Sequence, residues 1–294
     1  MKYAWITKHR DSFPIAVMCD TLQVSSSGYY GSLTRETSPR AQRHARIQEA
    51  VQQVHAESYG NYGSHKITRE LEQRDDLESA CRNTVACAMR EMGLSSRVRQ
   101  AFRPTTTQAD PAKQPAPNTL AQDFTADAPN RKWVSDITYV WTATGWAYVA
   151  VVLDLFSRKV VGWAVRDSLA TELVQEALRN AVEARRPQGH ELLHHSDRGC
   201  QYTSDAYQQT LRLLGIECSM SRSGCCYDNA VMERFFWSLK NEWTNHERYA
   251  SLQELRWSLF RYMETFYNSV RIHQTLGYLT PNAYEAEHAP ATAA

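Results

Sequence analysis

The stretch of residues 133–166, WVSDITYVWTATGWAYVAVVLDLFSRKVVGWAVR, decides the fold. It is rich in Val, Ile, Trp, Tyr and Thr, which favour β-strands, and short turns interrupt it at Thr144–Gly145 and Ser157–Arg158. Turns this short join neighbouring strands that run in opposite directions. The sequence therefore predicts three antiparallel strands, at residues 133–141, 146–155 and 159–166.

The segments that follow alternate between helix and strand patterns. Residues 171–185 and 204–214 carry apolar side chains at helical spacing, whereas residues 191–195 and 216–220 are typical of short buried strands. A last helix is expected over residues 230–244. Three strands followed by helix, strand, helix, strand and helix predict an α/β fold, a mixed five-stranded sheet with helices on its faces.

Upstream of the sheet, apolar residues recur at helical spacing in four segments, which predicts a small all-α region. Residues 103–118 hold four prolines among threonines, alanines and glutamines, a composition typical of a linker. We therefore expect four parts: a helical region at 1–102, a Pro-rich linker at 103–121, the α/β core at 122–288 and a disordered tail at 289–294.

Composition limits function only weakly. Hydrophobic residues make up 43% of the 294-residue chain, as in ordinary globular proteins. No apolar run approaches the roughly 18 residues that cross a bilayer, and no signal segment opens the chain, so we expect a cytoplasmic protein without a membrane partner. The seven cysteines form no C-x-x-C pair, which indicates reduced thiols. A net charge of +1 means that DNA binding must depend on local basic groups.

Three acidic residues stand out by their positions. Asp136 lies inside the first predicted strand, where aspartate is rare because it competes for backbone hydrogen bonds and is costly to bury. Asp197 follows the strand at 191–195, and ligand sites of open sheets lie at such strand ends. Glu233 lies beside the apolar stripe of the last helix, and Lys240, seven residues later, returns to almost the same angle.

Carboxylates that converge in this way bind hard cations. Mg²⁺ takes only one or two carboxylates plus water and phosphate oxygens, and two ions about 4 Å apart can activate a water or a 3′-hydroxyl for phosphodiester chemistry. We expect Asp136, Asp197 and Glu233 to be catalytic and to bind two Mg²⁺ or, alternatively, Mn²⁺ ions. Each residue alone also has an ordinary interpretation: a turn cap for Asp136, an Asx-turn before Gly199 for Asp197, and a solvated helix position for Glu233.

Together with the sequence segments around them, these residues resemble the DDE recombinases, specifically the second-reading-frame product (OrfB) of the IS-three family of bacterial insertion sequences. Thirty-five residues separate Asp197 from Glu233, the D-35-E spacing of that family and of retroviral integrases, and Lys240 stands at its basic position. The resemblance covers almost the whole chain except the linker and the Ala-rich end. The matching sequence segments are WVSDITY from Trp133, DLFSRKVVGW from Asp154, HSDRGCQY from His195, DNAVMERFF from Asp228, YNSVRIHQTLGY from Tyr267, YGSHKI from Tyr62 and VSSSGYY from Val24.

This resemblance implies an RNase H-like core preceded by a DNA-binding region, 1–102, that contains a helix-turn-helix. The implied activity is Mg²⁺-dependent cleavage of transposon ends, followed by joining of the freed 3′-hydroxyl to target DNA. The implied partners are double-stranded DNA, both transposon ends and target, further copies of the chain on that DNA, and the product of a shorter upstream frame. Because the chain lacks a zipper-length heptad run, we interpret it as the unfused part, acting at the bacterial nucleoid.

Several basic residues are candidates for DNA contact. We expect Lys240 to bind DNA because it shares a helix face with the last catalytic carboxylate. Arg97, Arg99 and Arg103 form a basic run able to hold phosphates, with a solvated helix end as the alternative. Arg271 and a nearby histidine either contact DNA or tie the last helices to the core.

Three other functions compete with the transposase. A plain RNase H-type nuclease would use similar carboxylates, but it would not explain Lys240 or the helical region in front. A helix-turn-helix regulator would explain the residues before the linker, but it would leave the acidic triad without a role. An inert copy of a mobile element is disfavoured by the complete triad and the uninterrupted frame.

Overall fold

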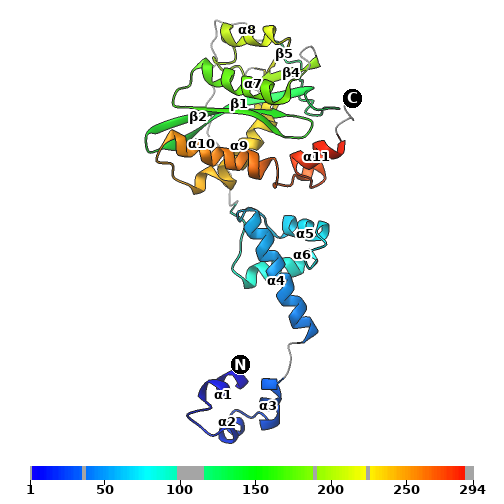
Figure 1. Cartoon of the computed structure of the whole chain (residues 1–294), viewed down its shortest axis with the longest axis vertical. Helices are drawn as coiled ribbons and strands as arrows, with labels where there is room; N and C mark the ends of the chain where they lie inside the picture. Colours follow the sequence, from blue (N-terminus) through cyan, green and yellow to red (C-terminus); the bar gives the residue numbers. More distant parts are fainter. Residues whose placement is uncertain (1, 35–37, 98–115, 188–190, 223–225, 289–294) are drawn as a thin grey trace.

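The computed structural model describes residues 2–34, 38–97, 116–187, 191–222 and 226–288. Figure 1 shows an N-terminal helical unit, a second helical unit and a larger α/β part. None of the helices in these ranges is both long and apolar enough to cross a membrane. The elements are α1 (Lys2–His9), α2 (Ile15–Thr21), α3 (Ser26–Thr34), α4 (Pro39–Glu57), α5 (Ser64–Gln73), α6 (Arg82–Glu91), β1 (Lys132–Thr142), β2 (Gly145–Asp154), β3 (Val160–Arg166), α7 (Thr171–Arg185), β4 (Leu193–Ser196), α8 (Asp205–Leu213), β5 (Glu217–Met220), η2 (Cys226–Asn229), α9 (Ala230–Glu242), η3 (Thr244–His246), α10 (Leu252–Phe260), the π-helical η4 (Arg261–Tyr267), η5 (Gln274–Leu276) and α11 (Pro281–His288).

Five strands form one mixed sheet in the order β3-β2-β1-β4-β5. β2 pairs antiparallel with both β1 and β3, whereas β4 pairs parallel with both β1 and β5. The turns after β1 and β2 contain left-handed residues, Gly145 at φ 120° and Arg158 at φ 61°. The predicted α/β class and the RNase H-like mixed sheet are confirmed. β3 and β5 start one residue later than predicted, and β4 starts two residues later, at Leu193, because its ladder with β1 begins there.

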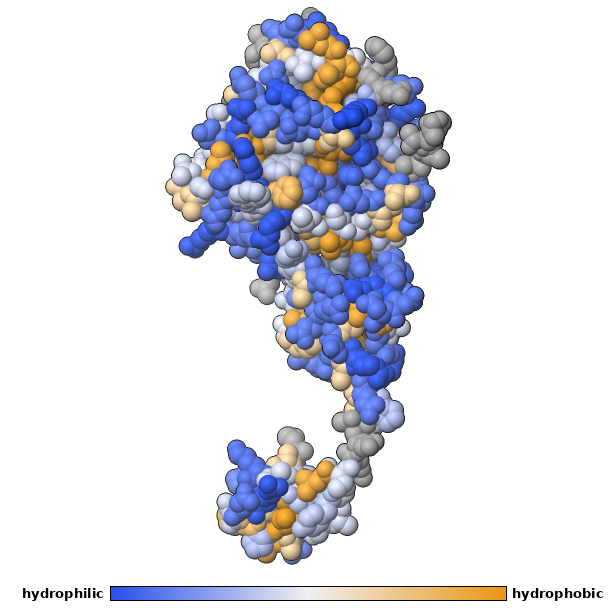
Figure 2. Space-filling view, viewed as in Figure 1, coloured by the Kyte–Doolittle hydropathy of each residue, from blue (hydrophilic) through white to orange (hydrophobic). Residues whose placement is uncertain are grey.

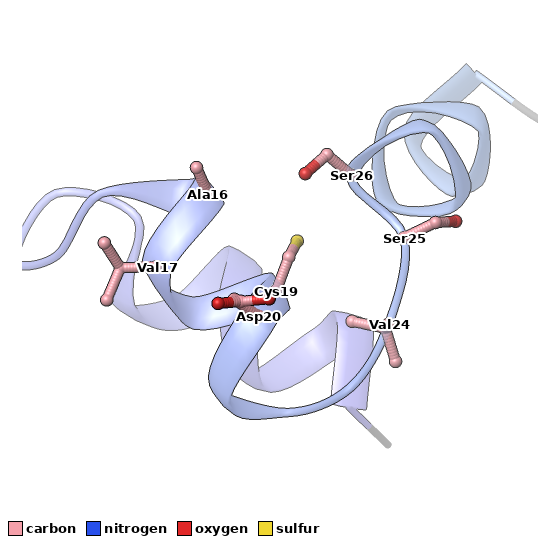
Figure 3. Close-up of a pocket in the computed structure, with 7 residues that line it drawn as sticks. All are labelled: Ala16, Val17, Cys19, Asp20, Val24, Ser25 and Ser26. Carbon is pink, nitrogen blue, oxygen red and sulfur yellow. The ribbon is translucent and has the colours of Figure 1, made fainter.

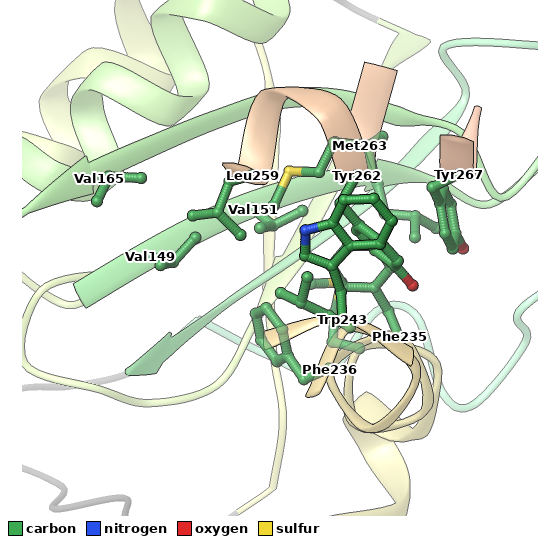
Figure 4. Close-up of a cluster of buried hydrophobic side chains, with 14 of the residues drawn as sticks. Val149, Val151, Val165, Phe235, Phe236, Trp243, Leu259, Tyr262, Met263 and Tyr267 are labelled. Carbon is green, nitrogen blue, oxygen red and sulfur yellow. The ribbon is translucent and has the colours of Figure 1, made fainter. Parts of the chain in front are cut away.

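Helices cover both faces of the sheet (Figure 1). α7 and α8 pack on one face around a core that includes Trp133, Leu178 and Tyr207. α9, α10 and η4 pack on the other face, and Figure 4 shows Phe235 and Trp243 among the side chains of that core. Burying one large apolar side chain contributes roughly 1.5–3 kcal/mol, so the two cores together hold the helices in place.

β3 approaches α7 closely at Gly162. A Cβ at this position would lie 2.4 Å from the Ala177 carbonyl oxygen and 2.6 Å from the Ala181 Cβ. Small residues on both elements therefore allow the helix to contact the strand backbone, and any side chain at position 162 would force the two elements apart.

The second helical unit has its own core. α4 starts at a capped end, where the Ser38 hydroxyl accepts a hydrogen bond from the Ala41 amide at 3.2 Å and Pro39 occupies the first turn. α4, α5 and α6 pack around one apolar cluster to which all three helices contribute. Its large aliphatic members on α4, α5 and α6 are Ile47, Val51, Val54, Ile67, Leu71 and Val85.

Tyr62 joins this unit to the α/β part. Its hydroxyl donates a hydrogen bond to the Val270 carbonyl at 3.0 Å and accepts one from the Ile272 amide at 2.8 Å. The Lys66 ammonium lies 4.7 Å from the centroid of the Tyr62 ring. Burial and, next, the charge of Arg271 lower the pKa of Lys66 to about 7. The junction therefore contains a lysine that deprotonates near neutral pH.

The predicted linker, 103–121, lies outside the described residues up to residue 115. Its last residues pack on the core: Leu120 is 2% exposed, and its amide donates to the Ser219 hydroxyl at 3.0 Å. The Pro117 carbonyl accepts a hydrogen bond from the Met220 amide at 3.2 Å. A segment that buries a leucine and bonds to β5 is part of the core, so linker character does not extend over 116–121. The other domain boundaries stay predictions, and the tail at 289–294 lies outside the described residues.

Gly162→Ala is expected to lower the free energy of unfolding by about 1–3 kcal/mol, because the added methyl group overpacks the β3–α7 contact. Denaturant unfolding of the full chain measures this change. Ala143→Ser, in the exposed turn after β1, is the control and should change the free energy of unfolding by less than about 0.5 kcal/mol. Equal stability of Gly162→Ala and wild type would contradict the close-contact interpretation.

Lys66 is expected to make the stability of the chain depend on pH. Between its folded pKa of about 7 and its usual value of 10.5, the unfolded chain binds more protons than the folded chain, so stability rises with pH in this window. The thermal midpoint of the wild type should therefore rise from pH 7 to pH 9, and Lys66→Met should lack that part of the rise. Lys8→Met, at an exposed position of α1, should keep the wild-type profile. An identical rise in Lys66→Met would rule out this role.

Candidate active site

Asp136 and Asp197 lie side by side on neighbouring parallel strands. β1 and β4 pair Lys132 with Leu193 and Val134 with His195. Continuing this offset by two residues places Asp136 level with Asp197, on strands about 4.8 Å apart. Side chains at the same level of a parallel pair point to the same face, so the sheet brings these two predicted residues together.

Each of these carboxylates is oriented by its own backbone. Asp136 Oδ1 accepts a hydrogen bond from the Ile137 amide at 2.8 Å, and Asp197 Oδ1 accepts one from the Gly199 amide at 2.9 Å. A Cβ at position 199 would lie 3.0 Å from Asp197 Oδ1, so a side chain there would crowd the carboxylate. The Asx-turn that was the ordinary alternative for Asp197 is therefore present, and it fixes the orientation of the carboxylate without excluding a catalytic role.

The face that carries both aspartates is the one that α9 covers. The side chains of Val134 and Val140 point to the same face of the sheet as Asp136, because residues an even number of positions apart in a strand share a face. Both valines pack in the same core as the α9 residues. The start of α9 is tied to β1, because the Asn229 side chain donates to the Ser135 carbonyl at 3.4 Å. Glu233 follows in the first turn of α9 and is exposed.

Lys240 lies on the same helix and reaches β1. Its ammonium is 4.6 Å from the centroid of the Tyr139 ring, a cation–π distance, and its side chain is half-buried. Burial lowers the pKa of Lys240, while the nearby charge of Asp136 acts in the opposite direction. The structure therefore places the predicted lysine beside the carboxylates.

Negative charge accumulates at this point. The pKa of Asp136 is raised well above its usual value, first by burial and then by the charge of Asp197, with a smaller contribution from Glu233. The Ile137 amide and Lys240 act against this rise. All three predicted carboxylates are therefore close enough to interact electrostatically, and a bound cation would relieve their repulsion.

The side chains as described do not form a ready-made metal cage. Within the described ranges, no group of three or more His, Cys, Asp or Glu side chains is arranged to hold one metal ion. Asp136 and Asp197 share a level and a face, whereas Glu233 extends from the neighbouring helix.

A group of buried polar residues that local sequence patterns do not predict lies on the opposite face, behind Asp136. The Tyr207 hydroxyl and His194 Nε2 are 3.2 Å apart, and Tyr202 packs edge-on against Tyr207. Burial raises the pKa of Tyr202, with further contributions from Tyr207 and Asp136. The position of Tyr202, five residues after Asp197, was the available signal, but only the tertiary fold brings it behind β1.

Arg97, the one residue of the predicted arginine run that the structure describes, does not lie at this site. Arg97 is exposed, and its amide donates a hydrogen bond to the Gly60 carbonyl at 3.0 Å, in the second helical unit. Arg99 and Arg103 lie outside the described residues. Their contact with phosphates stays a prediction.

Arg271 ties the last helices to the core, which decides between the two interpretations offered for it. It is buried and forms two hydrogen bonds of 2.7 Å to the carboxylate of Glu242, at the end of α9. The His273 ring lies 3.2 Å from the Arg271 guanidinium. Both residues are only 8% exposed, so their role is structural.

Family models match three segments of the chain. Residues 42–102 match an HTH-like domain, and residues 126–226 and 214–281 match two models of the integrase core domain. The helix-turn-helix expected within 1–102 is therefore confirmed, as is the integrase-like core.

Relatives match nearly from end to end. The transposase InsF for insertion sequence IS3A of Escherichia coli K12 is 39% identical over 289 residues, covering 97% of this chain and 98% of that protein. InsF for IS3fB of the same strain is 38% identical over 292 residues, covering 98% and 99%. A 31 kDa protein of insertion element IS600 from Shigella sonnei is 36% identical over 271 residues, covering 92% and 98%.

Solved structures with partial similarity include a viral intasome and integrase catalytic core domains. The simian T-cell lymphotropic virus intasome gives a TM-score of 0.47 at 16% identity, covering 82% of this chain and 76% of that one. The HTLV-2 integrase catalytic core domain in complex with magnesium gives 0.41 at 17% identity, covering 53% and 97%. On the strength of the sequence matches, this chain belongs to the IS3 family of insertion-sequence transposases, in which an HTH-like domain precedes an integrase core domain.

Proposed function

We propose that this transposase cleaves transposon ends and joins the freed 3′-hydroxyl to target DNA with Asp136, Asp197 and Glu233 as its catalytic carboxylates. The observation that carries the proposal is the level placement of Asp136 and Asp197 on adjacent parallel strands, on the face that α9 covers. The mutual effect of the three charges on the pKa of Asp136 supports it. No covalent protein intermediate is needed for this reaction class.

The donor chemistry fits Mg²⁺ or Mn²⁺. Carboxylate oxygens are hard ligands, and Mg²⁺ uses one or two of them and keeps water or phosphate oxygens in its remaining positions. A preformed cage of three side chains is therefore not required. Asp136 and Asp197 would hold the ions, with Glu233 joining from α9. When bound, two such ions would activate a water or 3′-hydroxyl and stabilise the leaving oxygen.

The chain's own side chains orient the reaction. Backbone amides fix Asp136 and Asp197, and the Asn229–Ser135 bond fixes the start of the helix that carries Glu233. Lys240, held against the Tyr139 ring, would contact a phosphate of the DNA strand that enters the site. Its half-buried position beside the carboxylates supports that role.

The proposed partners are double-stranded DNA, as transposon ends and as target, and further copies of the chain assembled on it. The product of the upstream frame is a proposed fusion or separate partner. Arg97, Arg99 and Arg103 are proposed phosphate contacts of the helical region. A plain nuclease would cut such DNA without joining it, so the joining step separates the two functions.

Asp136→Asn and Asp197→Asn are expected to lower the rate of strand transfer at least about a hundredfold, because asparagine keeps the shape of aspartate but loses the charge that attracts the metal. Glu233→Gln should do the same, although water could replace one ligand and leave a trace of activity. The assay follows cleavage and 3′-end joining of a labelled transposon-end duplex with Mg²⁺, with the upstream-frame product present.

Binding of the same duplex should survive in these variants, because a lost negative charge reduces repulsion of phosphates. Asp167→Asn, at an exposed position after β3, is the control and should keep wild-type rates. Wild-type rates in all three triad variants would exclude the carboxylate mechanism. A wild type that binds ends but never cuts them with any divalent metal would favour the regulator or the inert copy.

Lys240→Ala is expected to weaken binding of transposon-end DNA and to reduce the dependence of affinity on salt by roughly one phosphate contact. Fluorescence anisotropy over a series of salt concentrations measures both quantities. Arg179→Ala, exposed on α7 at the opposite face of the sheet, removes the same charge and should leave both unchanged. If Lys240→Ala matches Arg179→Ala, Lys240 does not contact DNA.

A further inference from the structure

The N-terminal unit, residues 2–34, lies outside the segments that the family models match. It contains α1, α2 and α3 and stands apart from the α/β part, beyond the far end of α4 (Figure 1). Its small core consists of Ile6, Met18, Cys19 and Tyr29, all at most 4% exposed. A unit with its own core can act as a separate binding module.

α2 and α3 are joined by a turn of four residues, Leu22–Ser25. Gln23 in this turn has a left-handed backbone, φ 53°, and the Val24 amide donates to the Cys19 carbonyl at 2.9 Å. The Ser25 hydroxyl caps α3 by accepting a hydrogen bond from the Gly28 amide at 3.0 Å. In Figure 3 α2 runs across the view while α3 is seen nearly end-on. Two short helices that cross at a turn of three to four residues are the geometry of a helix-turn-helix.

The second helix of this pair has one face packed and one face open. Tyr29 is 1% exposed, and a Cβ on Gly28 would lie 2.3 Å from the Tyr3 hydroxyl, so this side of α3 is pressed against α1. Ser26, Ser27 and Tyr30 are exposed and fall within about 100° of each other on the opposite side. Three hydroxyl groups, which both donate and accept hydrogen bonds, therefore line the open face near the start of the helix.

Positive charge lies at the turn. The Lys2 ammonium donates a hydrogen bond to the Leu22 carbonyl at 2.8 Å, which holds it beside the turn that leads into α3. Lys8 and Arg10 are also exposed in this unit. Asp20 lines the hollow between α2 and the start of α3 together with Ser26 (Figure 3). Its carboxylate would repel a phosphate but can accept a hydrogen bond from the exocyclic amine of cytosine, which favours a base edge in that hollow.

We propose that residues 2–34 form a second helix-turn-helix, separate from the matched domain at 42–102, in which α3 enters the major groove of duplex DNA. Ser26, Ser27 and Tyr30 contact base edges, and Lys2 contacts a backbone phosphate at the turn. The chain thus reads two separated segments of its DNA, one with each helical unit. This inference goes beyond the strand-transfer proposal and does not depend on it, because binding needs no metal.

An apolar surface on the same unit supports an alternative to DNA, which is a protein partner. Trp5, Phe13, Val17 and Thr21 line a shallow hollow beside α2, and Figure 2 shows hydrophobic side chains at the surface of this unit. A protein partner would use that surface. Because Ser27 does not line this hollow, substitutions at Thr21 and Ser27 separate the two occupants.

The test compares two variants of the full chain that gain the same charge. Ser27→Glu places a carboxylate on the open face of α3, where it repels DNA but suits a helix N-terminus, so the fold is kept. Thr21→Glu places one at the apolar hollow. Each protein selects sequences from a pool of random duplex DNA in EDTA, and footprinting on the duplexes selected by wild type then locates the protected segments. Circular dichroism checks that both variants are folded.

Wild type should enrich two separated segments. Ser27→Glu should lose protection of one segment and at least about tenfold in affinity, while Thr21→Glu keeps both. Tyr30→Ala should lose base preference at the same segment with an unchanged salt dependence, because it removes a base contact and no charge. A single enriched segment, unaltered binding by Ser27→Glu, or an equal loss in Thr21→Glu would overturn the proposal, and the last result would assign the unit to a protein partner.

Discussion

The parallel pairing of β1 with β4 is the constraint on which the active site depends. It joins residues 61 positions apart in the sequence and sets Asp136 level with Asp197. A slip of one residue would turn one of the two carboxylates to the opposite face of the sheet and separate the pair. α7 connects β3 to β4 and packs closely against β3 at Gly162.

The third carboxylate depends on a different set of contacts. α9 is tied to β1 at its start by Asn229 and to the C-terminal segment at its end by the buried Glu242–Arg271 pair. A buried ion pair offsets its desolvation only when its hydrogen bonds are complete, and here the Tyr262 hydroxyl donates a further bond to Glu242. Val270 and Ile272, on either side of Arg271, are bonded to Tyr62 of the HTH-like domain. The position of Glu233 and the docking of that domain therefore share one junction.

Local pattern was sufficient for much of this architecture. The strand-forming composition of residues 133–166 and the helical spacing downstream predicted the sheet and its helices, and an aspartate inside a strand pointed to Asp136. Other features depend on pairings between segments far apart in the sequence, which local periodicity does not encode. These features are the side-by-side placement of Asp136 and Asp197, the tyrosines behind them and the contacts of Tyr62 with the α/β part. Leu120 was missed because it is a single apolar residue at the end of a polar, Pro-rich stretch, and its burial depends on Ser219 of β5.

Charge explains why recognition and chemistry occupy different parts of the chain. A net charge of +1 leaves little general attraction for DNA, and the proposed site brings together three carboxylates, Asp136, Asp197 and Glu233, that interact electrostatically. In the proposed mechanism these carboxylates repel phosphates until cations are bound, so we expect DNA to be bound first elsewhere on the chain. The DNA contacts proposed for the two helical units lie away from the carboxylates, on the other side of the Tyr62 junction (Figure 1). Among the proposed DNA contacts, Lys240 is the one that lies beside the carboxylates.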